Sequence, residues 1–236
     1  MERTMFRHST WGLLAVDLKS GETLYELNAG TMFKPGSTTK VFTVSAALDL
    51  LGADYRFETP VYRRGKILKS GELEGDLILV ATGDITLGGR TTQDGHIAFT
   101  DIDHDHANDF AGAQLTTPDP AAGISNLAKQ VAKSGIKKVV GEVVIDDRFF
   151  DPAARQAGLN PVMINDNLID LVITPTKPGL PAKVEWRPRS SFYRMDVRIR
   201  TVKKVQPTQI DIRTPGSGQI VARGQISIGQ GPAVRV

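Results

Sequence analysis

The chain has 236 residues, of which 40% are hydrophobic, 23% are charged and none is cysteine. This composition is typical of a globular protein with enough chain for one large domain or two modest ones, and it excludes an intrinsically disordered chain. The lack of cysteine excludes disulfides and thiolate metal sites. The formal net charge is +3, and no apolar run approaches the roughly 18 residues of a bilayer-spanning helix, so no membrane span is predicted.

Two short apolar runs lie near the start of the chain, at residues 12–17 and 22–28. They are joined by Lys19-Ser20-Gly21, in which the glycine can take a positive φ, so the runs predict a β-hairpin. A helix is predicted from Val41 to Gly52, because glycine is the residue expected just beyond a helix C-terminus. We expect the hairpin to start a sheet that packs against this helix.

The start of the helix carries a serine and a lysine. Ser37 follows the loop residues Pro35 and Gly36, and Lys40 lies three residues later, so both side chains project from one helical face. A serine hydroxyl needs a nearby base, which an amine can be where burial and positive neighbours keep it unprotonated. Backbone N–H groups at the helix start would stabilise an oxyanion. By itself Ser-x-x-Lys is a weak motif, and a serine cap followed by a solvated lysine is the alternative.

A second domain is predicted to begin near residue 58, where the pattern changes to strands. Residues 59–68 and 75–82 have an apolar face at period two around glycine turns. Residues 120–135 have helical spacing, and residues 137–146 form an apolar strand that we expect to be largely buried. A helix followed by a strand indicates an α/β layer.

Residues 101–109 contain two histidines and four aspartates, a composition that could bind a divalent cation. His104 and His106 would face the same way only in a strand, and polar residues would then occupy both faces of that strand. We therefore expect a hydrated loop with local aspartate turns, and neither a metal nor a cofactor is predicted. A metal-dependent hydrolase that uses the two histidines is the alternative.

Residues 162–236 are predicted to form one strand after another, separated by prolines and glycines. Residues 165–167 are interpreted as side-chain-capped turn residues that lead into a strand at 168–173. Residues 187–204 are the densest basic stretch, at strand-like alternation. A solvated sheet face is the favoured interpretation over a polyanion site, so no nucleic-acid partner is predicted.

Several stretches resemble one enzyme family. Residues 11–59, WGLLAVDLKSGETLYELNAGTMFKPGSTTKVFTVSAALDLLGADYRFET, resemble the start of the serine D-alanyl-D-alanine carboxypeptidases that are low-molecular-mass class C penicillin-binding proteins. Further similar stretches follow in order: GELEGDL at 71–77, TGDITL at 82–87, GEVVIDDRFF at 141–150 and INDNLID at 164–170. This ordered succession is far more specific than Ser-x-x-Lys alone.

The resemblance implies an α+β fold with two parts. Residues 1–57 would be the N-terminal part of a catalytic domain like those of serine transpeptidases and β-lactamases. Residues 58–236 would be an inserted region, α/β to about residue 160 and strand-rich beyond it. The family is exported, which implies a periplasmic or extracytoplasmic location, although residues 1–7 lack the apolar core of a signal peptide.

The resemblance also implies an activity, which is hydrolysis of the terminal D-Ala-D-Ala bond of peptidoglycan stem peptides. Ser37 would be the acylated nucleophile and Lys40 its base, and β-lactam antibiotics would acylate the same serine. Asp146 and Phe150 stand where the family carries a carboxylate and an aromatic that help recognise the peptide's diamino-acid side chain. A turn-forming aspartate is the alternative for Asp146.

Two family elements are not found in the sequence. Neither Ser-x-Asn nor Tyr-x-Asn occurs, and Lys-Ser-Gly at residues 69–71 and 133–135 precedes the point where the family places this motif, so we interpret both as turns. The chain is therefore expected to be an N-terminal portion with weak or no activity by itself. A non-catalytic module that binds peptidoglycan peptides and a serine β-lactamase are the alternative functions.

Overall fold

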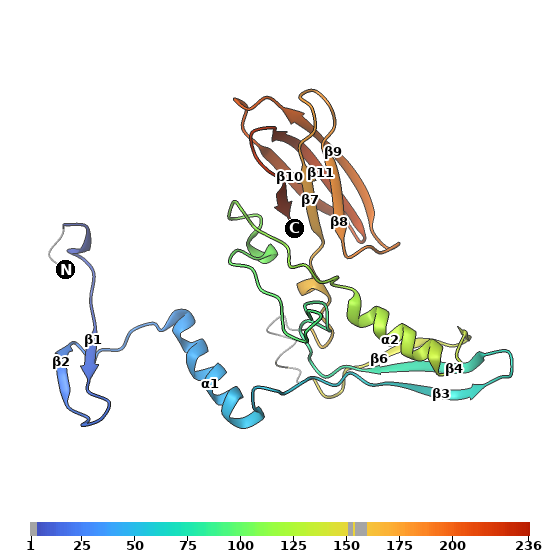
Figure 1. Ribbon diagram of the computed structural model, residues 1–236, viewed down its shortest axis with the longest axis horizontal. Coiled ribbons are helices and arrows are strands. Elements are labelled where there is room, and N and C mark those ends of the chain that lie inside the picture. Colours follow the sequence, from blue (N-terminus) through green and yellow to red (C-terminus); the bar gives the residue numbers. More distant parts are fainter. Residues whose placement is uncertain (1–3, 151–152, 154–159) are drawn as a thin grey trace. The chain divides into compact units, whose positions relative to one another are not determined.

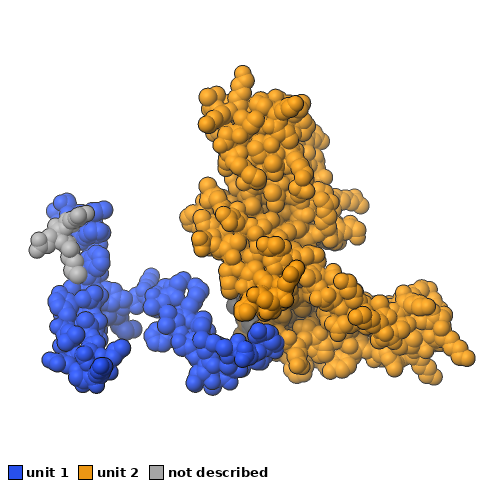
Figure 2. All heavy atoms as spheres, in the orientation of Figure 1, with its two compact units in different colours: residues 1–56 blue, residues 57–236 orange. Residues whose placement is uncertain are grey.

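The computed structural model describes residues 4–150, 153 and 160–236, and the chain separates into two compact units, Met1–Arg56 and Phe57–Val236 (Figure 2). Helices occur together with several separate sheets, mostly of antiparallel strands (Figure 1). The α+β fold class expected from the sequence is confirmed. No helix in the described ranges is both long enough and apolar enough to span a membrane.

The first unit holds a hairpin and a helix (Figure 1). Its elements are η1 (Thr4–Phe6), β1 (Leu13–Val16), β2 (Thr23–Leu27), η2 (Gly36–Thr38) and α1 (Thr39–Leu51). Strands β1 and β2 pair antiparallel, which confirms the predicted hairpin. The carboxylate of Asp17 holds the turn, because it accepts hydrogen bonds from the backbone N–H groups of Lys19 and Ser20 at 2.9 and 2.7 Å.

Helix α1 ends where the sequence predicted, and Gly52 takes a φ of 83° while its N–H donates to the carbonyl of Leu48. Its surroundings differ from the expectation, since α1 buries none of its side chains and Phe42 and Leu50 are 73% and 80% exposed. The expected packing of the hairpin against α1 is therefore wrong for the described residues. Apolar side chains lie on every side of α1, and a two-stranded hairpin offers too little surface to cover such a helix.

The second unit begins with an α/β layer (Figure 1). Its elements are β3 (Val61–Ile67), β4 (Glu72–Val80), η3 (His104–His106), α2 (Ala122–Lys133), β5 (Lys138–Val139) and β6 (Val143–Asp146). Strand β3 pairs antiparallel with β4, and β5 and β6 return after α2 to pair parallel with β4. The predicted helix and α/β layer are confirmed.

The strand predicted at 137–146 is not largely buried, which corrects the expectation. Val143 lies opposite Leu77 in the register, but Val143 is 70% exposed, and Val140 and Ile145 are 60% and 53% exposed. The reason is that β6 is at the edge of this sheet. Helix α2 instead faces β3 and β4, since Leu127 lines one hollow together with residues of those two strands.

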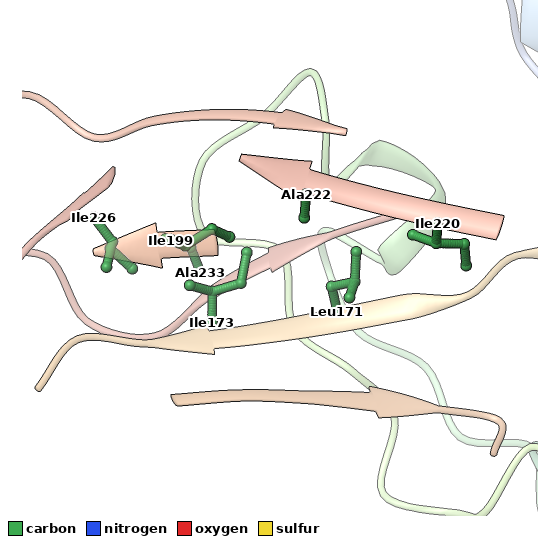
Figure 3. Packing of buried hydrophobic residues seen from close by; sticks show 7 residues of the cluster. All are labelled: Leu171, Ile173, Ile199, Ile220, Ala222, Ile226 and Ala233. Carbon is green, nitrogen blue, oxygen red and sulfur yellow. The ribbon is translucent and has the colours of Figure 1, made fainter. Parts of the chain in front are cut away.

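The remainder of the second unit is a pair of three-stranded sheets, which confirms the predicted run of strands. Its elements are η4 (Asn165–Asn167), β7 (Asp170–Thr174), β8 (Lys183–Arg187), β9 (Arg194–Val202), β10 (Gln209–Gly216), β11 (Gln219–Ser227) and β12 (Ala233–Arg235). The strand orders are β12-β7-β8 and β10-β11-β9. Between the sheets lies a hydrophobic core of Leu171, Ile173, Ile199, Ile220, Ala222, Ile226 and Ala233 (Figure 3).

Candidate functional site

Ser37 and Lys40 meet at the start of α1. Ser37 lies in η2, where the N–H of Thr38 donates to the carbonyl of Pro35 at 3.1 Å, and Lys40 lies in the first turn of α1. The Nζ atom of Lys40 donates a hydrogen bond to Oγ of Ser37 at 2.8 Å. The helix begins two residues before the predicted Val41, and the expected spacing brings amine and hydroxyl into direct contact.

The first unit does not cover this pair, because both residues are exposed to solvent. A general base must accept the hydroxyl proton, so the hydrogen bond has to reverse its direction before Oγ can attack a carbonyl carbon. That reversal requires a neutral amine, which surroundings that exclude water would favour. The described residues of the first unit thus bring the hydroxyl and the amine into contact. They do not form a closed pocket around these two groups.

Asp146, the last residue of β6, has its carboxylate occupied by an arginine. Arg148 donates to it from Nε at 2.8 Å, from Nη2 at 2.6 Å and from its backbone N–H at 3.2 Å. These hydrogen bonds lower the pKa of Asp146 to about 2. The Asp146 side chain is 13% exposed and that of Arg148 is 86% exposed, so a ligand would meet the guanidinium first.

Phe150 lies at the other end of the same turn. Its backbone N–H donates to the carbonyl of Asp147 at 2.9 Å, and its ring lies against Gly83, where an added Cβ would approach the ring to 3.1 Å. The N–H of Ala81 donates to the carbonyl of Asp146 at 2.9 Å. The structure therefore brings Asp146 and Phe150 together beside the loop that follows β4, within the second unit, whereas Ser37 and Lys40 belong to the first.

The polar segment 101–109 differs from the hydrated loop that the sequence predicted. His104 is only 2% exposed, and its ring is held from both sides. Nδ1 lies 2.6 Å from the carboxylate of Asp170, and Nε2 lies 2.7 Å from that of Asp166. The expectation is wrong at His104 because two carboxylates that are distant in the sequence close over it. The predicted aspartate turn is present locally, since Asp103 accepts a hydrogen bond from the N–H of His104.

Two arginines complete this cluster, which we call the His104 network: Arg90, Asp103, His104, Asp166, Asp170 and Arg187. Arg90 pairs with Asp103 and, at 2.9 Å, with Asp166. Arg187 of β8 donates to Asp170 at 2.9 Å and to the carbonyl of Thr116 at 2.6 Å. The network therefore ties the long loop before α2 to β7 and β8.

The charge of His104 follows from these partners. Burial by itself would lower its pKa, but the hydrogen bonds to Asp170 and Asp166 outweigh burial and raise the pKa to about 9. The protonated ring donates from both nitrogens, so neither nitrogen has a lone pair free for a cation. His106 is exposed and its ring contacts Phe110, so the two histidines do not converge. Over the ranges that the structure describes, no group of histidine and carboxylate side chains is arranged to hold a metal ion.

Asp166, one residue of the His104 network, lies in a segment with a strained backbone. Asn165, Asp166 and Asn167 have φ values of 54°, 53° and 58°, three consecutive left-handed residues. The side chain of Asn165 donates to the carbonyl of Leu168 at 2.9 Å, which confirms the predicted side-chain-capped turn. Such backbone costs of order 1–3 kcal/mol per residue and persists where its surroundings hold it, which the ion pairs of Asp166 do here.

Comparison with known proteins places this chain beside one family. A model of the D-Ala-D-Ala carboxypeptidase 3 (S13) family matches residues 3–232. A D-alanyl-D-alanine carboxypeptidase of Actinomadura is 26% identical over 241 residues, which is 94% of this chain and 39% of the relative. The D-alanyl-D-alanine carboxypeptidase DacB of Haemophilus influenzae is 28% identical over 151 residues, 64% of this chain and 24% of the relative.

Solved structures agree with this at the level of the fold. Two crystal structures of penicillin binding protein 4 from Haemophilus influenzae, one of them complexed with a β-lactam, superpose with TM-scores of 0.58 and 0.54 at 21% and 22% identity. Both cover 94% of this chain, and the chain covers 45% and 43% of theirs. The chain therefore spans less than half the length of the relatives that it matches.

Proposed function

Because the chain belongs to the D-Ala-D-Ala carboxypeptidase S13 family, we propose that Ser37 and Lys40 are the nucleophile and base of a serine-type carboxypeptidase acting on peptidoglycan stem peptides. The observation that carries this proposal is the 2.8 Å hydrogen bond between Lys40 Nζ and Ser37 Oγ. The family match also favours this activity over that of a serine β-lactamase, which shares Ser-x-x-Lys.

The proposed reaction has two steps. Neutral Lys40 takes the hydroxyl proton of Ser37 while Oγ attacks the carbonyl carbon of the penultimate D-Ala. The C–N bond then breaks, the terminal D-Ala leaves with the proton on its amine, and an ester joins the remaining peptide to Ser37. Water hydrolyses this ester and restores the serine. Backbone N–H groups at the start of the helix would stabilise the oxyanion of each step.

The second unit, residues 57–236, is proposed as the inserted region of this family, and its Asp146 and Phe150 as substrate-recognition residues. Asp146 stays ionised well below neutral pH and so could bind the ammonium group of a peptide side chain. Arg148 now occupies both carboxylate oxygens, so an incoming ammonium would have to displace or share this pair. The proposed location is extracytoplasmic, where peptidoglycan lies.

The decisive experiment is acylation by a labelled penicillin, followed by mass spectrometry of the labelled peptide. We expect weak or no labelling of this chain by itself, because its described residues leave Ser37 and Lys40 open to solvent. In a polypeptide that extends this chain to the full length of its relatives we expect the label on Ser37, and its loss in Ser37→Ala. The matched control is Thr43→Ala on the same helix, which should label normally. Label on any other residue would refute the assigned nucleophile.

A second function has one observation in its favour, namely that the second unit has a hydrophobic core of its own while the serine site is exposed. In this alternative the protein is a non-catalytic module that binds peptidoglycan peptides through Asp146. Asp146→Asn should then weaken binding of a diamino-acid peptide, measured by calorimetry, while Ser37→Ala should not. Retained binding in Asp146→Asn would refute the role of Asp146 in either function.

A further inference from the structure

Charge is distributed unevenly along the chain. Residues 160–236 carry twelve lysines and arginines against five aspartates and glutamates, a net charge of +7, whereas residues 1–159 carry seventeen against twenty-one, a net charge of −4. The overall charge of +3 therefore hides a strongly basic region that coincides with the two sheets of β7 to β12. A basic region of this size attracts anionic partners.

The register of one sheet gathers this charge on a single face. Because alternate residues of a strand share a face, Arg194, Arg198 and Arg200 of β9 lie on the face opposite to the core residue Ile199. The pairing adds Arg223 of β11, opposite Arg198, and Arg213 of β10. We call these five arginines the arginine face: Arg194, Arg198, Arg200, Arg213 and Arg223.

Only part of this charge is neutralised within the sheet. Asp196 pairs with Arg223 and more distantly, at 3.4 Å, with Arg198, and Asp211 pairs with Arg213 at 2.7 Å. Neither Arg194 nor Arg200 has an ion pair with any residue in the described part of the chain. Five arginines against two aspartates leave the face with a charge of +3.

A hollow lies beside two of these arginines. It has a volume of about 600 Å³, and its lining combines Arg198, Arg200, Gln209 and Gln225 with apolar residues, among them Pro181, Ala182, Val197 and Ile199. The register sets Gln225 opposite Arg200 and Gln209 opposite Gln225, so these side chains form a row across the sheet. Strands β10 and β11 approach closely here, since a Cβ at Gly224 would lie 2.0 Å from the carbonyl oxygen of Gln209. Two arginines and two glutamines thus contribute to the lining of one concave surface.

We propose that the arginine face binds a linear polymer whose backbone carries phosphate groups. Guanidinium groups bind phosphate through paired N–H donors, and the N–H groups of glutamine amides can donate to phosphate oxygens as well. Arginines two residues apart on β9 are spaced by about 6.6 Å, so successive phosphates of an extended chain can be bound in turn. The hollow is several times larger than one phosphate ion and shares Arg198 and Arg200 with the arginine face, which favours a polymer over a small anion.

The residue types on the arginine face distinguish between nucleic acids and phosphate polymers that lack bases. Proteins that bind single-stranded nucleic acids place aromatic side chains in the groove for the bases to stack on. The positions that β9, β10 and β11 contribute to this described face include Arg, Asp, Gln, Val and Ser, with no aromatic residue. The site therefore suits a phosphate backbone without bases. Its residues belong to the second unit, whereas Ser37 and Lys40 belong to the first.

The experiment measures binding of fluorescein-labelled long-chain polyphosphate to the full chain by fluorescence anisotropy, over a series of NaCl concentrations. The double variant Arg198→Gln/Arg200→Gln should bind roughly tenfold more weakly at low salt. Its log–log salt slope should fall by about 1.4, because each phosphate that an arginine neutralises contributes about 0.7 to the slope. The control Lys129→Gln/Lys133→Gln removes the same charge from exposed positions of α2 and should change affinity less than about twofold. Circular dichroism confirms that both variants are folded.

Several outcomes would overturn the proposal. Equal weakening by the two double variants would mean that net charge alone drives binding. Tighter binding of a single-stranded oligonucleotide than of polyphosphate, with the same loss in Arg198→Gln/Arg200→Gln, would identify a nucleic-acid surface instead. Binding to vesicles that contain phosphatidylglycerol, without binding to polyphosphate, would identify a membrane surface. Competition by inorganic phosphate as effective as by polyphosphate, on a phosphate basis, would exclude an extended ligand.

Discussion

The two compact units differ in where they keep their apolar side chains. In the first unit none of the described residues 4–56 is buried, although α1 and the hairpin are rich in leucine and valine. The second unit contains every buried hydrophobic residue that the structure describes, and the larger of its two hydrophobic clusters lies between the sheets of β7 to β12. Burial of apolar surface contributes about 25 cal/mol per Å², so the second unit supplies most of its own stability and the first does not.

The polar groups of the two units differ in the same way. The hydrogen bond between Lys40 and Ser37 is open to solvent, whereas His104 and Asp170 of the His104 network are 2% and 0% exposed. An exposed polar contact contributes at most about 1 kcal/mol, and loss of one partner from a buried ionic cluster costs about 3–5 kcal/mol. The Ser37–Lys40 pair therefore lies in the unit with the least burial, and the interactions expected to stabilise the protein most lie in the second unit.

The largest effect is expected for Asp170→Asn. This change leaves Arg187 and protonated His104 without their shared buried carboxylate, so the free energy of unfolding of the second unit should fall by about 3–5 kcal/mol. Urea unfolding followed by fluorescence of Trp186, in a Trp11→Phe background, measures it. The control Asp211→Asn breaks the exposed pair with Arg213 and should cost less than about 1 kcal/mol. Equal costs would show that burial of the network is not what stabilises it.

A pH series is expected to reveal the charge of His104. Its pKa is raised in the folded chain, from about 6.5 to about 9, so its stabilising contribution is complete below pH 6.5 and is lost as the pH rises through 9. The loss should be on the order of 3 kcal/mol between these limits. Urea unfolding at pH 6 to 9.5 measures it, and His104→Gln should remove most of the pH dependence. An unchanged pH profile in that variant would assign the titration to another group.

A smaller effect is expected in the core between the sheets. Ile173 is fully buried among Leu171, Ile199 and Ile226 (Figure 3), so Ile173→Val should lower the unfolding free energy by about 0.5–1.5 kcal/mol. The matched control is Val205→Ala, at a position that is 90% exposed, and it should change stability by less than about 0.5 kcal/mol. A control as costly as the core variant would mean that Val205 packs against something in solution.

The smallest effect on stability is expected at the motif itself. Ser37→Ala removes one exposed hydrogen bond, so hydrogen exchange of the amides in α1 should change by less than a few-fold, equivalent to about 0.5 kcal/mol. In the unaltered chain the amides of α1 should exchange much faster than those of β7, because α1 has no buried side chain. Protection of α1 equal to that of β7 would contradict the contrast between the two units.

Local chemistry made much of the fold predictable. The hairpin follows from two apolar runs around Lys19-Ser20-Gly21, the end of α1 from Gly52, and α2 from the helical spacing of residues 120–135. The contact between Ser37 and Lys40 follows from helix geometry, since residues three apart are neighbours on one face. Each of these features depends on residues that are close in sequence.

The His104 network was not predicted, because its partners are 62 and 66 positions away from the histidine. The polar alternation of residues 101–109 indicates a hydrated loop when it is considered by itself. One signal was available, namely that Asp170 begins the apolar strand DLVIT. A carboxylate in a strand that is buried on both faces requires a cationic partner somewhere in the chain.

The amino-acid sequence by itself determined the strands, the helices, the family and the spacing of the serine and lysine, because these depend on backbone preferences and neighbouring side chains. Tertiary structure decided which groups are buried and which are paired. It left Val143 exposed, placed two carboxylates against His104 and paired the Asp146 carboxylate with Arg148. The physical reason is that burial and ionic pairing depend on surfaces contributed by distant segments, which no local pattern encodes.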